Sequence, residues 1–370
     1  MKLSMKLSPI RVSALSQSSA RTATLTKPLI LMGQRHNSTL VSYMVTPQQL
    51  SNAIDKNPRI VPVCASWFLP NDPQKRTGQQ VFREQRIPGA RFFDLDDVKD
   101  HDSLYPHMLP TAEDFAKAME KIGIKREDEI VVYDSKELGI FSAPRVGWTF
   151  RVFGHPTVHV LNNFRLWVEQ GYPTESGKIE TAQGKAGSYP IPSVDPERVV
   201  KFAEVKDIAK HYGDEDADGI QILDARSKDR WAGSAPEPRP GLPSGHIPGS
   251  LSVPLPDLLD QKTGALLSGA ELRKVFESKG INTKKPIISS CGTGVTAAVI
   301  DAALAEANYG PADDRRLYDG SWTLVLVSPG SLVWCNADDL LGSGQCESWK
   351  SVRLKRTTSF TKQRKLQLRL

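Results

Sequence analysis

The stretch Pro286-Ile287-Ile288-Ser289-Ser290-Cys291-Gly292-Thr293-Gly294-Val295-Thr296-Ala297-Ala298 decides the fold of this chain. Its apolar, β-branched start predicts a short buried strand, and the alanine-rich residues 295–307 predict a helix. A cysteine ends the strand, and a tight Gly-Thr-Gly turn leads into the helix. A strand that runs into a helix in this way is typical of a parallel sheet flanked by helices.

Cys291 stands where backbone N–H groups can converge. Gly292 and Gly294 let successive N–H groups point at one spot, and the start of the next helix adds its positive end there. A thiolate at that spot is stabilised and reactive, which predicts Cys291 as a nucleophile. The alternative is a packing role, because cysteine is among the most buried residue types. Leu or Val would pack as well at 291 without a ring of donors, so we favour catalysis.

Composition and charge limit the classes of function. The 370 residues suffice for two domains plus tails, and 39% hydrophobic with 24% charged residues is typical of a globular protein. No Asp or Glu precedes Asp55 or follows Glu347. The two ends hold six and eight of the 48 Lys and Arg, which leaves 34 basic against 42 acidic residues between them. An acidic body argues against nucleic acid as the main partner.

The four cysteines, at 64, 291, 335 and 346, are too few and too scattered for a disulfide framework. No Cys-x-x-Cys pair suggests a zinc or dithiol redox site, so we predict no metal and no organic cofactor. A reducing compartment fits this cysteine usage. No stretch approaches the roughly 18 apolar residues of a membrane span, so we predict none.

Residues 1–42 have the composition of a mitochondrial transit peptide. They are rich in Ser and Thr, contain spaced basic residues and lack acidic ones. A disordered tail without a targeting role is the alternative. We expect a location in the mitochondrial matrix, and the sequence leaves open whether a cytoplasmic pool exists.

From residue 45 onward the pattern alternates between strands and helices. In the first half we predict a helix opening at 46–50, helices over 111–122 and 143–153, and strands over 60–64, 90–93, 129–133 and 157–161. In the second half we predict helices over 199–212, 270–279 and 295–307, and strands over 220–223, 250–253, 286–290 and 316–318. This alternation predicts an α/β fold with two largely parallel sheets flanked by helices.

Shared motifs indicate that the two halves are copies of one domain. Arg86-Ile87-Pro88-Gly89-Ala90 matches His246-Ile247-Pro248-Gly249-Ser250, and Asp134 takes the position of Cys291 in the first copy. We therefore predict an N-terminal domain without a nucleophile over 43–173, a linker over 174–196 and a catalytic domain over 197–327. The basic residues 328–370 form an atypical tail, which we expect to be disordered.

These motifs carry a family resemblance over roughly residues 45–323. Together with Asp224-Ala225-Arg226 and Tyr318-Asp319-Gly320-Ser321-Trp322, they resemble tandem rhodanese-domain sulfurtransferases. Thiosulfate sulfurtransferases of that family place basic side chains just after the cysteine. The uncharged Cys291-Gly292-Thr293-Gly294-Val295 is similar to the 3-mercaptopyruvate sulfurtransferase branch.

The resemblance implies further site residues. Arg230 and Arg239 match the family's substrate-binding arginines, and a guanidinium fork suits an α-keto carboxylate. Taken singly, each arginine could be a solvated surface charge. Asp96 and His107 match an acid–imidazole pair that works with a loop hydroxyl, here Thr293, to move a proton. His107 alone could be a packing residue, and Thr293 alone could serve only to hold the loop.

The backbone N–H groups that would hold the transferred sulfur belong to the residues after the cysteine, namely Gly292, Thr293, Gly294, Val295 and Thr296. The activity implied is transfer of sulfur from 3-mercaptopyruvate, through a Cys291 persulfide, to a thiol such as thioredoxin or to cyanide, with release of pyruvate. The alternatives are a thiosulfate sulfurtransferase, which gives thiocyanate and sulfite, and a non-enzymatic sulfur-relay or binding module. A phosphatase of the same fold is excluded because Ala297 stands where phosphate binding needs Arg.

Two stretches depart from the family pattern. After Thr323 the family continues with an acidic–aromatic pair and a closing helix, whereas this chain continues with Leu324-Val325-Leu326 and then a basic tail. The last element of the second domain is therefore missing or replaced. In the first half, Asn162-Asn163 stands in place of an Asp-Gly-Gly turn, and Asn tolerates the left-handed backbone that such a turn requires.

Overall fold

A computed structural model describes residues 40–178, 188–214, 219–239, 242 and 244–327. The predicted transit peptide lies outside the described residues except for 40–42, and the predicted tail lies wholly outside them. Most of the predicted linker, apart from residues 179–187, is described.

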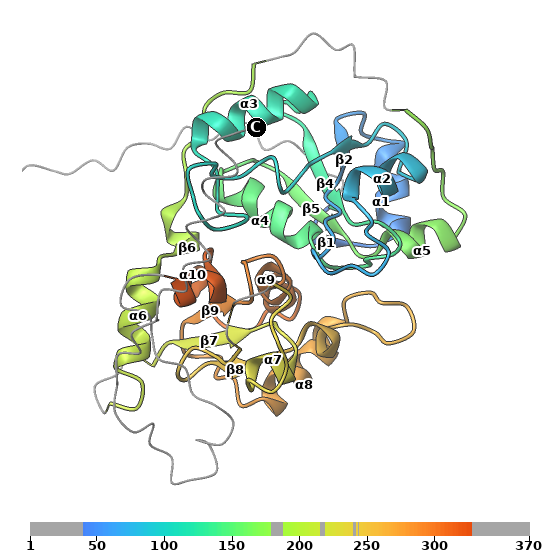
Figure 1. Cartoon of the computed structure of the whole chain (residues 1–370). Coiled ribbons are helices and arrows are strands. Elements are labelled where there is room, and N and C mark those ends of the chain that lie inside the picture. The colour runs from blue at the N-terminus through green and yellow to red at the C-terminus, as the bar shows by residue number, and fades with distance from the viewer. Residues whose placement is uncertain (1–39, 179–187, 215–218, 240–241, 243, 328–370) are drawn as a thin grey trace, which may run out of the picture. The chain divides into compact units, whose positions relative to one another are not determined.

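The N-terminal half contains one sheet of five parallel strands in the order β1-β5-β4-β2-β3. The strands are β1 (Met44–Val45), β2 (Ile60–Cys64), β3 (Arg91–Phe92), β4 (Glu129–Tyr133) and β5 (Val158–Leu161). The helices are α1 (Pro47–Ile54), α2 (Gly78–Glu84), α3 (Ala112–Ile122), α4 (Ala143–Val152) and α5 (Phe164–Glu169). Figure 1 shows α1, α2 and α5 on one face of the sheet and α3 and α4 on the other.

The C-terminal half repeats this arrangement with the parallel order β6-β10-β9-β7-β8. Its strands are β6 (Val199–Val200), β7 (Gln221–Asp224), β8 (Leu251–Ser252), β9 (Ile287–Ser290) and β10 (Arg315–Tyr318). Its helices are α6 (Phe202–Lys210), α7 (Lys228–Trp231), α8 (Gly269–Ser278), α9 (Ala297–Glu306) and α10 (Ser321–Val327). Short 3-10 turns occur at Pro196–Arg198, Leu255–Leu258 and Ala312–Asp314. The predicted α/β fold, with two parallel sheets, is confirmed.

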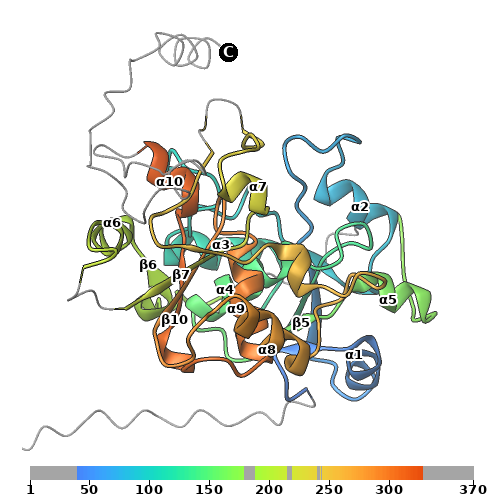
Figure 2. The same ribbon diagram turned by 90° about the horizontal axis from the view of Figure 1, so that it is seen from below.

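Local chemistry explains the helix boundaries that matter for the site. The side chain of Thr111 accepts the N–H of Asp114 at the start of α3, and Gly123 ends that helix in the left-handed conformation. Helix α9 is rich in alanine, and its residues 297–304 are all buried. Its neighbour α4 is buried over most of its length, and Figure 2 shows α4 and α9 side by side. Small side chains permit this close approach, and the contact joins the first half to the helix that directly follows the cysteine loop.

Some predicted elements need correction. The helix expected over 199–212 begins at Phe202, because Val199 and Val200 pair with Leu317 and Tyr318 as a short strand. β-Branched residues favour such a strand over the first turn of a helix. Helices α2, α5, α7 and α10 were not predicted. The last of these shows that the divergent sequence after Thr323 continues a helix that begins at Ser321.

The unusual asparagine turn in the first half is formed as expected. Asn163 has a φ of +85° and its side chain accepts the N–H of Arg165 at the start of α5. Its amide also donates to the carbonyl of Thr263 in the second half, at 2.6 Å. The turn therefore contributes a contact between the two halves as well as starting a helix.

Candidate active site

Cys291 follows β9 directly and is held by the start of α10. Its N–H donates to the hydroxyl of Ser321 at 3.1 Å, and its carbonyl accepts the N–H of Trp322 at 3.0 Å. The carbonyl of Gly292 accepts both the N–H and the hydroxyl of Thr323, at 3.0 and 2.8 Å. The residues that depart from the family pattern thus begin just after the contacts that anchor the cysteine.

The loop after the cysteine presents free backbone donors. None of the N–H groups of residues 292–296 donates a hydrogen bond to any part of the chain that the structure describes. Gly294 has a φ of +79°, which bends the loop in a way that disfavours other residues. Helix α9 then begins at Ala297 without a side-chain cap. Unpaired N–H groups on such a bend are suited to an anion. That these five N–H groups hold the transferred sulfur stays a prediction.

Asp96, His107 and Thr293 meet in one chain of hydrogen bonds, although they come from different halves. The Nδ1 atom of His107 lies 3.1 Å from the hydroxyl of Thr293. Its Nε2 atom lies 3.2 Å from Oδ1 of Asp96. The imidazole is fully buried, whereas the Asp96 side chain is 59% exposed. His107 also adopts a φ of +62°, a conformation that costs energy in a residue other than glycine.

The surroundings of His107 favour its neutral form. Burial lowers the pKa of His107 below its ordinary value, and the hydrogen bond that the imidazole donates to Asp96 opposes this effect. The same hydrogen bond lowers the pKa of Asp96, which is therefore a carboxylate. A carboxylate can only accept, so Nε2 carries the proton and Nδ1 is left to accept the Thr293 hydroxyl. This arrangement can take a proton from the hydroxyl and return it.

Trp67 is a part of the site that the sequence analysis missed. Its indole N–H donates to Oδ2 of Asp96 at 2.8 Å, and its ring lies edge-on to His107 with centroids 4.5 Å apart. Its backbone N–H donates to the hydroxyl of Ser142. The available signal was its position shortly after the strand that ends at Cys64, because ligand sites form at the carboxyl ends of parallel strands.

The two predicted arginines both lie near the cysteine loop. A Cβ atom placed on Gly292 would lie 3.2 Å from Nη2 of Arg230. Arg239 interacts electrostatically with His107, with Asp96 and with Cys291. Burial lowers the pKa of Arg239 from its ordinary value, which marks a guanidinium that is short of counter-charge.

Glu237 is a second residue that the sequence analysis missed. Its carboxylate accepts Nε and Nη2 of Arg230 at 3.2 and 2.5 Å, and accepts Nη1 of Arg226 at 2.8 Å. Arg226 is itself buried against Asp224. The fork of Arg230 is therefore partly occupied by Glu237. Within the described residues Arg239 makes no such ion pair, so its guanidinium has fewer internal partners than that of Arg230.

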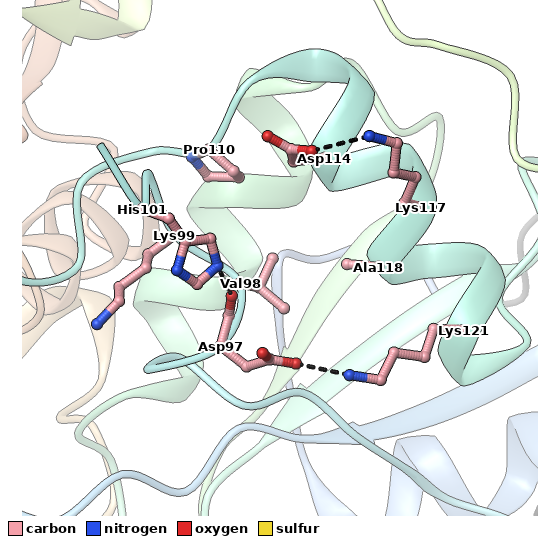
Figure 3. Close-up of a pocket in the computed structure, with 9 residues that line it drawn as sticks. All are labelled: Asp97, Val98, Lys99, His101, Pro110, Asp114, Lys117, Ala118 and Lys121. Carbon is pink, nitrogen blue, oxygen red and sulfur yellow. Dashed lines mark hydrogen bonds and ion pairs between the residues drawn. The ribbon is translucent and has the colours of Figure 1, made fainter. Parts of the chain in front are cut away.

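A surface pocket adjoins this region but contains none of the predicted site residues (Figure 3). It is lined by Asp97, Val98, Lys99, His101, Pro110, Asp114, Lys117, Ala118 and Lys121. Lys117 pairs with Asp114 at 3.1 Å and Lys121 pairs with Asp97 at 2.9 Å, so these charges are already balanced. Cys291 does not line this pocket, and its side chain is only 2% exposed.

Two searches of the described residues complete the inventory. No three His, Cys, Asp or Glu side chains in that part of the chain lie close enough together to hold a metal ion. Among the helices described there, none has the length and hydropathy to span a membrane.

Comparison with known proteins identifies the family. The family model for the rhodanese-like domain matches residues 204–326. A probable 3-mercaptopyruvate sulfurtransferase of Schizosaccharomyces pombe is 42% identical over 271 residues, which cover 73% of this chain and 87% of the relative. The chain belongs to the 3-mercaptopyruvate sulfurtransferase family. The predicted tandem rhodanese fold and sulfurtransferase activity are thereby confirmed, and the chain is an enzyme.

Further relatives of this sulfurtransferase agree. A protein of Arabidopsis thaliana named thiosulfate/3-mercaptopyruvate sulfurtransferase 1, mitochondrial, is 41% identical and matches 72% of this chain and 71% of its own length. The crystal structure of the Tum1 protein from Saccharomyces cerevisiae superposes with a TM-score of 0.71 at 36% identity. It covers 80% of this chain and 98% of the Tum1 chain. A mitochondrial relative thus exists.

Proposed function

We propose that this enzyme takes its sulfur from 3-mercaptopyruvate and passes it through a Cys291 persulfide to a thiol or to cyanide. The observation that carries the proposal is the hydrogen-bonded chain of Thr293, His107 and Asp96 beside an uncharged cysteine loop. A dianionic donor such as thiosulfate needs no proton to be moved, whereas a thiol donor does. Proton-transfer groups at the loop therefore favour 3-mercaptopyruvate over thiosulfate.

In the first step the Cys291 thiolate attacks the sulfur of the donor. A sulfur–sulfur bond forms, the carbon–sulfur bond breaks, and its electron pair leaves on pyruvate as the enolate. The thiol proton passes to the Thr293–His107 pair and returns to the enolate carbon, which gives pyruvate and a Cys291 persulfide anion. Arg239 and Arg230 hold the carboxylate and carbonyl of the donor. The free N–H groups of residues 292–296 stabilise the developing sulfur anion.

In the second step an acceptor attacks the outer sulfur of the persulfide. The sulfur–sulfur bond breaks and its electron pair returns to Cys291 as a thiolate. A thiol acceptor, whether small or of the thioredoxin type, leaves as a persulfide, and cyanide leaves as thiocyanate. In the first half-reaction the donor carbon is reduced while the transferred sulfur is oxidised, and in the second the electron pair of the sulfur–sulfur bond returns to Cys291. Neither half-reaction therefore requires an external oxidant or reductant.

The donor is tested by steady-state kinetics with one acceptor and two donors. We expect kcat/KM for 3-mercaptopyruvate to exceed that for thiosulfate by about 10-fold or more, since the loop offers no side-chain cation for a second negative charge. Cyanide is the acceptor in both arms, so that only the first step differs. Equal or higher kcat/KM with thiosulfate would refute the proposal for the donor.

Thr293→Val removes the hydroxyl that His107 contacts while keeping the shape of the side chain. Because general acid–base groups contribute about 10²–10⁴-fold, we expect kcat with 3-mercaptopyruvate to fall by about 10²-fold. Thr293→Ser retains a hydroxyl and is the matched control, with kcat within a few-fold of the parent. A valine variant with unchanged kcat would show that Thr293 only holds the loop.

Asp96→Asn tests the direction of the His107 titration. The carboxylate raises the pKa of His107 against the effect of burial, so its loss lowers that pKa further. His107 must be neutral to accept a proton, and the acidic limb of the kcat–pH profile should therefore move to lower pH. The maximal kcat should fall as well, because the imidazolium loses its counter-charge. Asp97→Asn, at a neighbouring exposed carboxylate, should change neither quantity.

We propose a mitochondrial matrix location directed by residues 1–42; the alternative is that these residues have no targeting role. Their basic, acid-free composition supports this address. A fusion of residues 1–42 to a fluorescent protein should co-localise with a matrix marker. A diffuse cytosolic signal would contradict the proposal.

A further inference from the structure

A buried guanidinium joins the imidazole segment of the first half to the cysteine loop of the second. Arg145 lies in α4 and is 1% exposed. Its Nη2 atom donates to the carbonyl of His107 at 2.6 Å and to Oδ1 of Asp319 at 2.5 Å. Its Nη1 atom donates to the carbonyl of Gly294 at 3.4 Å. One side chain thus contacts the backbone of both segments whose side chains meet at the Thr293–His107 hydrogen bond.

Asp319 pairs with Arg145 and also binds the backbone close to His107. It follows β10 and its side chain is 5% exposed. While Oδ1 accepts Arg145, Oδ2 accepts the N–H of Leu109 at 2.9 Å. The carbonyl of His107 and the N–H of Leu109 are therefore fixed by the two members of one ion pair. These contacts fix the backbone of His107 and of the segment that follows it.

The energetics of this pair point to a role beyond stability. Two buried charges pay a desolvation cost that their attraction often fails to recover, so such a pair is weak evidence for stabilisation. The Nε atom of Arg145 is buried and has no hydrogen-bond partner among the described residues. His107 moreover adopts a φ of +62°, which the surrounding contacts must enforce. The contacts of the pair are thus concentrated on a strained residue of the site.

We propose that Arg145 and Asp319 are positioning residues that set the distance between His107 and Thr293 across the two halves. The inference rests on the proposed proton transfer through that pair. Neither residue touches the reacting sulfur, and both act through the backbone of His107 and Gly294. Because hydrogen bonding and proton transfer fail over a displacement of about 1 Å, small movements of either segment are costly to turnover.

The positive charge of Arg145 adds a second, measurable effect. Burial is the main cause of the lowered pKa of His107, and the charges of Arg239 and Arg145 act in the same direction. Removal of the Arg145 charge should therefore raise that pKa. The acidic limb of the kcat–pH profile would then move to higher pH, opposite to the shift expected for Asp96→Asn.

The test compares Arg145→Gln and Arg145→Lys with Arg151→Gln. Arg151 lies on the same helix and pairs with Asp301 of α9 at 3.6 Å, so it is a matched ion pair between the halves that does not touch the site. We expect kcat to fall by about 10- to 10²-fold in both Arg145 variants with little change in KM. Only the glutamine variant should show the pH shift, since lysine keeps the charge. Arg151→Gln should keep the parent kcat and pH profile.

A double variant separates positioning from a general loss of structure. If Arg145 acts through the Thr293–His107 pair, Arg145→Gln should lower kcat by less than about 3-fold when Thr293 is already valine. The inference would be overturned if the kcat losses of Arg145→Gln and Thr293→Val multiplied in the double variant. It would also be overturned by an unchanged kcat in the single Arg145 variants, or by an equal kcat loss in Arg151→Gln. Should Arg145→Gln fail to fold, Asp319→Asn preserves shape, removes the same ion pair and carries the kcat comparison with Arg151→Gln and with Thr293→Val. If Thr293→Val alone has no effect, the proposed proton transfer itself fails.

Discussion

Replacement of Cys291 by serine is expected to abolish sulfur transfer. A serine hydroxyl cannot form the sulfur–sulfur bond through which the sulfur is held, so neither half-reaction can proceed. Removal of a covalent nucleophile lowers kcat by several orders of magnitude in other enzymes, and we expect a loss of about 10⁴-fold or more here. Turnover is measured as pyruvate release from 3-mercaptopyruvate with cyanide as acceptor.

A second cysteine that is buried in the described part of the chain supplies the matched control. Cys64 ends β2 in the first half, as Cys291 follows β9 in the second, and its thiol lies 3.3 Å from the hydroxyl of Ser66. Burial raises the pKa of Cys64 to about 12, so it is not a thiolate at neutral pH. Cys64→Ser should keep the parent kcat. Equal activity of Cys291→Ser and the parent would end the case for a persulfide at 291.

Gly294→Ala is expected to damage both the site and the fold. The residue has a φ of +79°, and a Cβ atom there would lie 2.6 Å from the carbonyl oxygen of Asp319 and 2.8 Å from Nη1 of Arg145. The left-handed backbone costs about 1–2 kcal/mol and overpacking about 1–3 kcal/mol, so the free energy of unfolding should fall by about 3 kcal/mol. The loop must also move, and kcat should fall by about 10²-fold or more.

Gly89→Ala measures the cost of a left-handed backbone conformation without a steric clash of the added Cβ atom. Gly89 has a φ of +72°, yet a Cβ atom there would meet nothing within 4 Å. We expect this variant to lose only about 1 kcal/mol of unfolding free energy in urea and to retain its kcat. If Gly294→Ala were no worse than Gly89→Ala in either measurement, the cysteine loop would be far more tolerant than its contacts indicate.

Local sequence pattern was sufficient to predict the strand, the turn and the helix around Cys291. The apolar run before Cys291, the two glycines and the alanine-rich helix follow from rules that act over a few residues. The same rules failed at Val199 and Val200, where pairing with β10 overrode a helical pattern. Short strands at a sheet edge depend on a partner that is distant in sequence, so local propensity cannot identify them.

The parts of the candidate site that depend on contacts between the two halves could not be predicted from local sequence pattern. His107 and Thr293 are 186 residues apart, and only the family resemblance brought them together. Trp67, Glu237 and Arg145 were missed because nothing in their neighbourhoods distinguishes them from packing or surface residues. The roles proposed for them rest on the partners that the fold gives them, which are Asp96, Arg230 and the backbone of His107.

The measurement that tests the central claim most directly is mass spectrometry of the enzyme after exposure to 3-mercaptopyruvate without an acceptor. The account predicts one added sulfur on the peptide that contains Cys291, none on the peptide that contains Cys64, and loss of that sulfur when cyanide is added. A sulfur-free Cys291 in an enzyme that has released pyruvate, or a sulfur carried by another residue, would contradict it.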